Sequence, residues 1–251
     1  MSYKGMTIYF MRHGETYLNF YHRMQGWSNA PLTEQGKIDV RRSGRGLSDV
    51  TFDAVYTSDL HRTVETANIV LEENNHADDL VIKTMPQFRE VFFGGFDGLK
   101  IDETYEDIAK HQGYDTVAEF LGDTNLPQRM AAFRDADEFG DAEDFMMFWS
   151  RIEDGLLDIV NKHKQNDETI LVVVHGLVIR YMVESLVPQL ENPDALSNAS
   201  ITQLRYEDGL FHAKAYNQVD HFVELEPHEL EDPQEELDED IEEEYDEDLN
   251  D

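Results

Sequence analysis

Four side chains in this sequence could together handle a phosphoryl group: Arg12, His13, Arg62 and His175. The guanidinium group of arginine stays charged at physiological pH, and its planar fork matches phosphate oxygens. A neutral imidazole is a good nucleophile near neutral pH and can carry a phosphoryl group. Phosphoryl transfer also needs positive charge around the equatorial oxygens and a proton for the leaving oxygen. Each residue alone is weak support, because Arg62 could be a surface residue and His175 a hydrogen-bonded histidine at a strand end.

The interpretation as a phosphoryl-binding site is strengthened because these residues follow predicted strands in the sequence. Apolar runs predict buried strands at residues 7–11, 54–57, 80–84 and 169–174. Arg12 and His13 directly follow the first run, Arg62 comes shortly after the second, and His175 follows the last. Because ligands bind outside the carboxyl ends of strands in open α/β sheets, we expect the four side chains to meet at one edge.

Helical patterns lie between these strands, at residues 34–47, 59–73, 145–164 and 176–186. Thr33 is a plausible N-cap of the first helix, and Ser58 of the second. Two further runs, 201–206 and 211–216, flank Glu-Asp-Gly and predict an antiparallel hairpin. The alternation of strands and helices predicts an α/β protein. We expect a three-layer α/β/α fold with a mostly parallel central sheet and one antiparallel edge hairpin.

Residues from about 99 to 144 interrupt the alternation. They are polar, acidic and irregular, and we interpret them as an insertion over the C-terminal edge of the sheet. Large apolar side chains within and just after this segment could line a specificity pocket or belong to the core. We favour the core for these residues, which are Phe133, Phe139, Phe145, Met146, Met147 and Trp149.

The charge of the chain limits its partners. A formal net charge of −34 argues against a nucleic acid or an anionic membrane as partner, because both need clustered Lys and Arg. Residues 224–251 contain 17 Asp or Glu and no Lys or Arg, which predicts a solvated, disordered tail behind a domain spanning residues 1–223. The tail could serve solubility alone or bind a partner.

The absence of cysteine and of long apolar segments limits the possible metal sites and the compartment of the protein. The absence of cysteine excludes disulfides, thiolate metal sites and a cysteine nucleophile. The apolar run at 7–11 is too short for the core of a signal peptide, and no segment approaches a membrane span. We therefore expect a cytoplasmic protein, with no indication of its oligomeric state.

Several sequence blocks, taken in order, resemble the histidine phosphatase superfamily, also called phosphoglycerate-mutase-like. The blocks are 11–16 (MRHGET), Asn19, 25–36 (QGWSNAPLTEQG), 52–67 (FDAVYTSDLHRTVETA), 88–98 (FREVFFGGFDG), 174–177 (VHGL) and 198–202 (NASIT). Together they span roughly residues 5–220. The order of the blocks makes the resemblance specific, whereas a lone Arg-His-Gly would not be.

The resemblance implies a role for each matching residue. His13 would be the phosphorylated nucleophile, with Arg12, Arg62 and His175 holding the phosphoryl group. Asn19 and Gly176 would also belong to the phosphate pocket, and Gly14 would let the backbone turn tightly after the nucleophile. Glu90 stands where the family has its proton donor. No metal or organic cofactor is implied.

The identity of the acid can also be judged from its neighbours. Val91, Phe92 and Phe93 are apolar, and desolvation among them would raise the pKa of Glu90, as suits a general acid. Asp97 is a weaker candidate nearby.

The family contains both phosphatases and mutases, so the acceptor must be inferred. Its mutases bind phosphoglycerate with extra basic residues after the acid, including an adjacent arginine pair. Between residues 105 and 144 this chain has only Lys110, Arg129 and Arg134 as cations, among many acids. We therefore predict hydrolysis of a small phosphorylated metabolite. A cofactor-dependent phosphoglycerate mutase is the alternative, and a non-catalytic module that binds a phosphorylated ligand is a second one.

Overall fold

A computed structural model describes residues 5–187, 190 and 194–229 of the chain. Six strands form one sheet in the order β3-β2-β4-β1-β5-β6. Their bounds are β1 Met6–Arg12, β2 Ala54–Thr57, β3 Ile82–Thr84, β4 Thr169–Val174, β5 Ile201–Glu207 and β6 Leu210–Gln218. Strands β3, β2, β4 and β1 are parallel, whereas β5 runs antiparallel to β1 and pairs with β6 as the edge hairpin.

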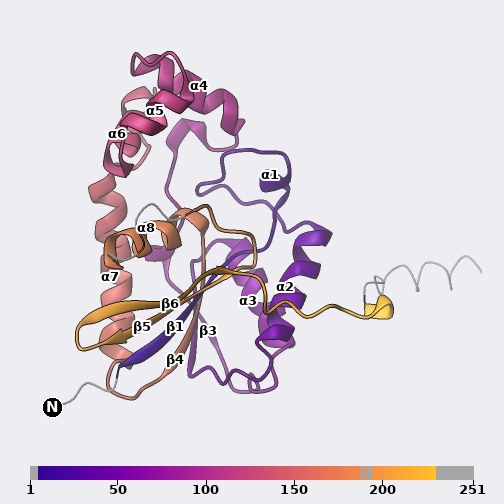
Figure 1. The fold of residues 1–251 in the computed structure, drawn as a ribbon. Coiled ribbons are helices and arrows are strands. Elements are labelled where there is room, and N and C mark those ends of the chain that lie inside the picture. Colours follow the sequence, from indigo (N-terminus) through magenta and orange to yellow (C-terminus); the bar gives the residue numbers. More distant parts are fainter. Residues whose placement is uncertain (1–4, 188–189, 191–193, 230–251) are drawn as a thin grey trace, which may run out of the picture.

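Helices cover both faces of this sheet (Figure 1). Their bounds are α1 Tyr17–Phe20, α2 Glu34–Gly46, α3 His61–Glu72, α4 Ile101–His111, α5 Val117–Asp123, α6 Leu126–Ala136, α7 Phe145–His163 and α8 Gly176–Leu186. Helices α2 and α3 pack on one face and α7 and α8 on the other. Alternate residues of β4 divide between the two cores: Ile170 and Val172 face one, and Leu171 and Val173 the other. The predicted three-layer α/β/α fold with a mostly parallel sheet is therefore confirmed.

The predicted helix boundaries differ from the structure mainly at α3. At α2, Thr33 is the N-cap as predicted, and its hydroxyl accepts a hydrogen bond from Gly36 N at 2.9 Å. At α3, the N-cap is Leu60, without a side-chain cap, so the prediction for Ser58 was wrong. Strand β3 begins at Ile82, two residues after the predicted start.

The segment from about 99 to 144 is largely helical, so its description as irregular was wrong. It holds α4, α5 and α6, which Figure 1 places above the C-terminal ends of β1 and β4. Two capping boxes, Thr116 with Glu119 and Asn125 with Gln128, begin α5 and α6. These were the local signals that indicated helices.

The apolar residues in and after this segment do not all belong to the core. Phe133 is buried, as expected. Phe139, Met146 and Met147 are exposed, so the expectation of core positions was wrong for them. Phe145 and Trp149 are partly buried and stack on each other.

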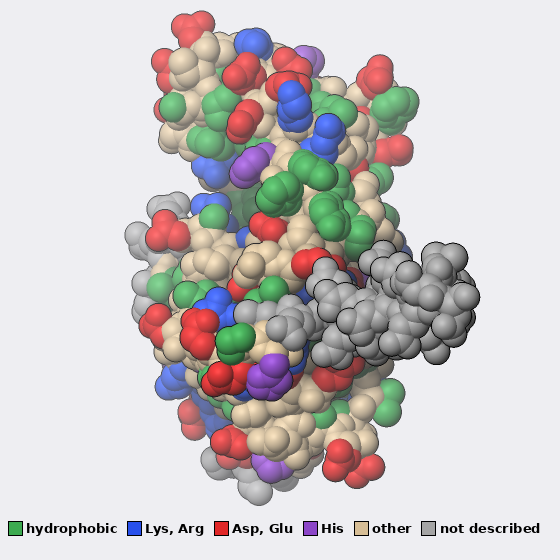
Figure 2. Space-filling view, turned by 90° about the vertical axis from the view of Figure 1, so that its right-hand side faces the viewer, with side chains coloured by type: hydrophobic (Ala, Val, Ile, Leu, Met, Phe, Trp, Pro, Cys, Tyr) green, Lys and Arg blue, Asp and Glu red, His purple; other side chains and the backbone are tan. Residues whose placement is uncertain are grey.

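The first residues of the predicted acidic tail contact the domain. Arg45 of α2 pairs with Glu229 at 2.8 Å, Arg42 pairs with Glu224, and Leu225 is buried. The packed chain thus continues to Glu229, and residues 230–251 of the predicted tail lie outside the described residues. On the face shown in Figure 2, acidic side chains are scattered over the molecule and Lys and Arg form no continuous patch. No helix within the described ranges is long and apolar enough to cross a membrane.

Candidate active site

The end of β1 places His13 at the carboxyl edge of the sheet. Strand β1 lies between β4 and β5, and His13 N donates a hydrogen bond to the carbonyl of Val174, the last residue of β4. Gly14 follows without a left-handed backbone, so it is not needed for the tight turn predicted from the sequence. A Cβ at Gly14 would instead lie 2.6 Å from Val40 Cγ2 and 3.0 Å from the Gly36 carbonyl. Glycine therefore lets α2 approach the loop behind the nucleophile.

Two hydrogen bonds determine the tautomer of His13. Its Nδ1 lies 2.8 Å from the carbonyl oxygen of Gly14, which can only accept, so Nδ1 carries the proton. Its Nε2 accepts a hydrogen bond from Arg62 Nε at 3.2 Å, which requires a lone pair there. Burial, then the charges of Arg62 and Arg12, lower the pKa of His13 well below its ordinary value of 6.5. His13 is therefore a neutral imidazole with its lone pair on Nε2.

Arg62 lies in the first turn of α3 and is completely buried. Besides His13, it donates to the Ser28 carbonyl at 3.0 Å and to the Gly26 carbonyl at 2.8 Å. These bonds tie the loop at 26–28 to the nucleophile. Three of the five guanidinium N–H groups are used in this way, which leaves two for a ligand.

His175 is completely buried beside His13, with ring centroids 5.3 Å apart. Its Nε2 is hydrogen-bonded to Ser58 Oγ at 2.9 Å. Ser58 therefore contacts the second histidine rather than capping α3. Burial and the nearby Arg62 lower the pKa of His175 well below 6.5.

Arg12 and Gly176 are in contact. Arg12 donates a hydrogen bond to the Leu196 carbonyl, and a Cβ at Gly176 would lie 3.3 Å from Arg12 Nε. A glycine at the start of α8 thus leaves room for the arginine side chain.

Glu90 is a buried carboxyl group at the same site. Its two oxygens accept hydrogen bonds from Val91 N at 3.0 Å and from Leu177 N at 3.2 Å. Burial raises the pKa of Glu90 above its ordinary value. Asp97, the weaker candidate acid, instead accepts hydrogen bonds from the backbone N–H groups of residues 26, 27 and 28. Its carboxylate organises that loop.

A pocket of about 300 Å³ brings five of the predicted residues together, namely Arg12, His13, Asn19, Glu90 and Gly176. Arg62 and His175 do not line it but contact His13 directly, as described above. Asn19 also accepts a hydrogen bond from Thr16 N at 3.2 Å, which caps α1.

Sequence reasoning missed four polar residues of this wall, namely Arg23, Gln25, Tyr105 and Arg180. Gln25 stands in one of the blocks that carried the resemblance, so it could have been chosen. Arg180 lies three residues after Leu177 on α8, a spacing that places both on one helix face.

Three buried nitrogen atoms of the site have no hydrogen-bond partner within the described part of the chain: Arg12 Nε, Gln25 Nε2 and His175 Nδ1. A buried polar group without a partner costs about 1–3 kcal/mol. Of these three residues, Arg12 and Gln25 line the pocket, where bound phosphoryl oxygens would accept hydrogen bonds from their N–H groups. In the same described residues, no three His, Asp or Glu side chains gather into a metal site.

Comparisons with known proteins identify the family of this chain. The family model of the histidine phosphatase superfamily (branch 1) matches residues 8–219. A 2,3-bisphosphoglycerate-dependent phosphoglycerate mutase of Neisseria meningitidis is 28% identical over 193 residues, which cover 72% of this chain and 85% of the relative. The crystal structure of a phosphoglycerate mutase from Bacillus anthracis superposes with a TM-score of 0.82 at 32% identity, covering 88% of this chain and 96% of the other.

A more distant structure shares the fold alone. The alpha-ribazole phosphatase from Shigella flexneri has a TM-score of 0.66 at 21% identity, covering 88% of this chain and 100% of the other. Mutases and a phosphatase thus have this architecture in common. With the family model matching most of its length, the chain belongs to branch 1 of the histidine phosphatase superfamily.

Proposed function

We propose that this protein hydrolyses phosphomonoesters through a phosphohistidine intermediate on His13. The observation that carries the proposal is the neutral imidazole of His13, whose Nε2 lone pair lies beside Arg62 and whose ring lines a pocket together with Glu90. Nucleophile, positive charge and a carboxyl group of raised pKa are the parts that phosphoryl transfer requires.

In the first step, His13 Nε2 attacks the phosphorus atom and the ester P–O bond breaks on the opposite side. Glu90, whose protonated form is favoured by burial, gives its proton to the leaving oxygen. Arg12 stabilises the equatorial oxygens from the pocket wall, which Gln25 and Asn19 complete. Arg62 and His175, which contact His13 without lining the pocket, would add to this stabilisation through their remaining N–H groups.

In the second step, the Glu90 carboxylate accepts a proton from water, and the oxygen of that water attacks the phosphorus. The N–P bond breaks, its electron pair returns to His13 Nε2, and inorganic phosphate leaves. Both steps use the same carboxyl group, first as acid and then as base.

Water is the acceptor because the insertion offers little to hold a phosphoglycerate. Lys110 is exposed and pairs with Glu106, and Arg134 donates to the Ala142 carbonyl. Arg129 donates to the carbonyls of Leu121 and Thr124, which ties α5 to α6. A mutase must retain the free acid while the phosphoryl group returns to it, and these cations are already engaged.

Phosphoglycerate mutase activity is the second candidate, because the relatives named above include phosphoglycerate mutases. To distinguish the two, purified protein is incubated with p-nitrophenyl phosphate and with 3-phosphoglycerate, with and without a trace of 2,3-bisphosphoglycerate. We expect phosphate release, and little interconversion of phosphoglycerates. Rapid interconversion with little phosphate release would overturn hydrolysis in favour of the mutase.

The intermediate is tested by acid-labile labelling. Wild-type protein mixed briefly with a ³²P-labelled phosphomonoester should retain an acid-labile label, and His13→Ala should not. A wild-type protein that binds phosphate but neither becomes labelled nor releases phosphate would instead be a non-catalytic binding module.

A further inference from the structure

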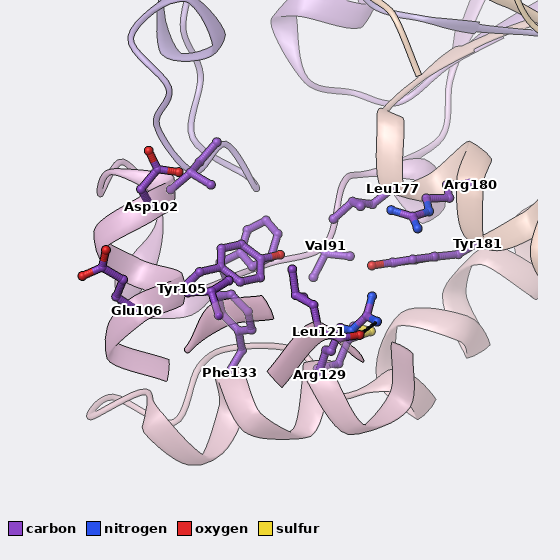
Figure 3. Close-up of a pocket in the computed structure, with 14 residues that line it drawn as sticks. Val91, Asp102, Tyr105, Glu106, Leu121, Arg129, Phe133, Leu177, Arg180 and Tyr181 are labelled. Carbon is purple, nitrogen blue, oxygen red and sulfur yellow. Dashed lines mark hydrogen bonds between the residues drawn. The ribbon is translucent and has the colours of Figure 1, made fainter. Parts of the chain in front are cut away.

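A second, larger cavity adjoins the pocket at His13. It has a volume of about 640 Å³ and lies between the insertion helices and α8 (Figure 3). Most of its lining is apolar, from Val91, Phe93, Ile101, Val117, Leu121, Met130, Phe133 and Leu177. The two spaces share five lining residues, namely Phe93, Ile101, Tyr105, Leu177 and Arg180. One ligand could therefore occupy both.

The position of the acid indicates which part of a substrate enters this cavity. If Glu90 protonates the leaving oxygen, as in the function proposed above, that oxygen must lie close to its carboxyl group. Glu90 accepts a hydrogen bond from Leu177 N, and Leu177 lines both spaces. The leaving alcohol therefore starts at the junction, and the large cavity is the space available for its remainder.

Arg180 is the notable cation at this junction. Its Nε is buried and has no hydrogen-bond partner among the described residues, and no carboxylate oxygen of those residues lies within 4.0 Å of its guanidinium nitrogens. Arg129, the other cation of the cavity, is bonded to two backbone carbonyls. Arg180 thus has hydrogen-bonding capacity that the rest of the cavity does not use.

The charges within the cavity are separated. Figure 3 shows Arg180 extending from α8 and Arg129 from α6 on one side, whereas Asp102 and Glu106 lie on α4 at the other. An anionic group of a ligand is therefore attracted to the α8 side and repelled from the α4 side.

We propose that the substrate is the phosphomonoester of a large, mostly apolar alcohol that carries a carboxylate, and that Arg180 binds this carboxylate. The planar guanidinium fork matches a carboxylate geometrically. One arginine without a carboxylate partner among the described residues suits a monoanion, whereas the dianionic phosphoryl group has Arg12 in its own pocket and Arg62 beside His13. This substrate class rests on the proposed function, because Glu90 sets the direction of the leaving group.

The first experiment compares ligands that differ in one group. Phenyl phosphate and 3- or 4-carboxyphenyl phosphate differ only by the carboxylate, and 3-phosphoglycerate offers a carboxylate without an apolar body. A hydrogen bond to a charged group corresponds to about tenfold to a hundredfold in affinity. We expect at least a tenfold higher kcat/KM for the better carboxyphenyl isomer than for phenyl phosphate, and a lower value for 3-phosphoglycerate than for either aromatic ester.

The second experiment changes the cation. Arg180→Met should bring the ratio of kcat/KM between carboxyphenyl and phenyl phosphate close to one, and Arg180→Lys should keep part of the preference. Lys162→Met is the matched control, because it removes one positive charge from an exposed site on α7 and should keep the wild-type ratio. A merely structural role of Arg180 would lower both rates together and leave their ratio unchanged.

The same comparison by titration calorimetry does not depend on turnover. Benzylphosphonate and its 4-carboxy derivative have no ester bond to break, and the second should bind the wild type at least tenfold more tightly but not Arg180→Met. Equal binding of the two phosphonates to the wild type, or an unchanged preference in Arg180→Met, would overturn the role of Arg180. Absence of hydrolysis with a preserved binding preference would overturn the proposed function alone.

Discussion

His13 is kept as a neutral nucleophile by contacts that act on opposite ring nitrogens. The Gly14 carbonyl requires a proton on Nδ1, and Arg62 requires a lone pair on Nε2. The same arginine that would stabilise the phosphoryl group thus also disfavours protonation of the nucleophile. Burial favours the neutral form of Glu90 as well, but for a carboxyl group this raises the pKa instead of lowering it. One buried environment therefore prepares both a base-like nucleophile and an acid.

Glu90→Gln tests the acid at the residue scale. A leaving alkoxide needs a proton, whereas p-nitrophenolate leaves readily without one. We expect kcat for an alkyl phosphate to fall by about 10²–10⁴-fold, and kcat for p-nitrophenyl phosphate to fall much less. Steady-state kinetics on both substrates gives the two ratios. Equal losses would show that Glu90 does not protonate the leaving group.

His13→Asn tests the buried neutral histidine through stability. Because the pKa of folded His13 lies below the unfolded value of 6.5, the unfolded chain binds an extra proton as the pH falls below 6.5. This contribution to stability is complete above pH 6.5 and is lost as the pH falls toward the folded pKa. In that range the free energy of unfolding should fall less steeply in the variant, by about 1.4 kcal/mol per pH unit.

Urea denaturation between pH 5 and 7 measures both slopes. Burial raises the pKa values of Glu90 and Asp97, which act in the opposite direction on acidification, and lowers that of His175, which acts in the same direction as His13. These three groups are common to both proteins, so their main contributions cancel in the difference. Parallel curves for wild type and variant would mean that folding does not lower the pKa of His13.

At the scale of elements, the site depends on how closely α2 approaches the loop after β1. A Cβ at Gly36 in the first turn of α2 would lie 2.3 Å from the Glu15 carbonyl oxygen. That oxygen belongs to the backbone, so the contact can be relieved only by moving the helix or the loop. The position of His13 therefore depends on how α2 packs against the loop formed by Gly14 and Glu15.

Gly36→Ala should therefore reduce both stability and activity. We expect a loss of about 1–3 kcal/mol in the free energy of unfolding, together with a lower kcat. The matched control is Gly122→Ala in α5, where no atom lies within 4 Å of the added Cβ. There the change should stabilise the protein by about 0.5–1 kcal/mol. A neutral effect of Gly36→Ala in thermal and chemical denaturation would show that α2 can shift without cost.

At the scale of the whole molecule, the charge opposes the approach of an anionic substrate. The net charge is −34, whereas Arg12 and Arg62 make the site itself positive. Residues 230–251 carry 14 acidic residues and no Lys or Arg, so removing them changes the net charge to −20. Glu224 and Glu229 stay in the shortened chain and keep their contacts with α2.

Added salt should therefore raise kcat/KM for a phosphomonoester. Raising the ionic strength from about 0.01 M to about 0.1 M shortens the Debye length from about 30 Å to about 10 Å, which screens the distant negative charges. The chain ending at Glu229 should show a smaller increase, because fewer repelling charges remain. A steep fall of kcat/KM with salt would show that attraction by the local pocket dominates the encounter.

The sequence by itself determined the fold class and predicted most residues of the candidate site. Arg12, His13 and His175 sit at or directly after strand ends, and strands of β-branched and aromatic residues are strong local signals. Parallel strands bring their carboxyl ends to one edge, so the convergence of these residues required no further information. Glu90 was different, because only the resemblance selected it among 54 acidic residues.

Only the tertiary structure determined the shape of the large cavity and showed which of its arginines already have hydrogen-bond partners. The helices α4, α5 and α6 are short, and α5 and α6 begin at capping boxes, but the mutual packing of the three depends on contacts between distant segments. Whether an arginine is engaged also depends on its neighbours in space: Arg129 meets backbone carbonyls, and Arg180 does not within the described residues. The role of Ser58 also depends on a neighbour in space: its residue type suits the N-cap of α3, but its hydroxyl is hydrogen-bonded to His175. Local sequence specifies which groups are present, and long-range packing specifies which of them remain available for a ligand.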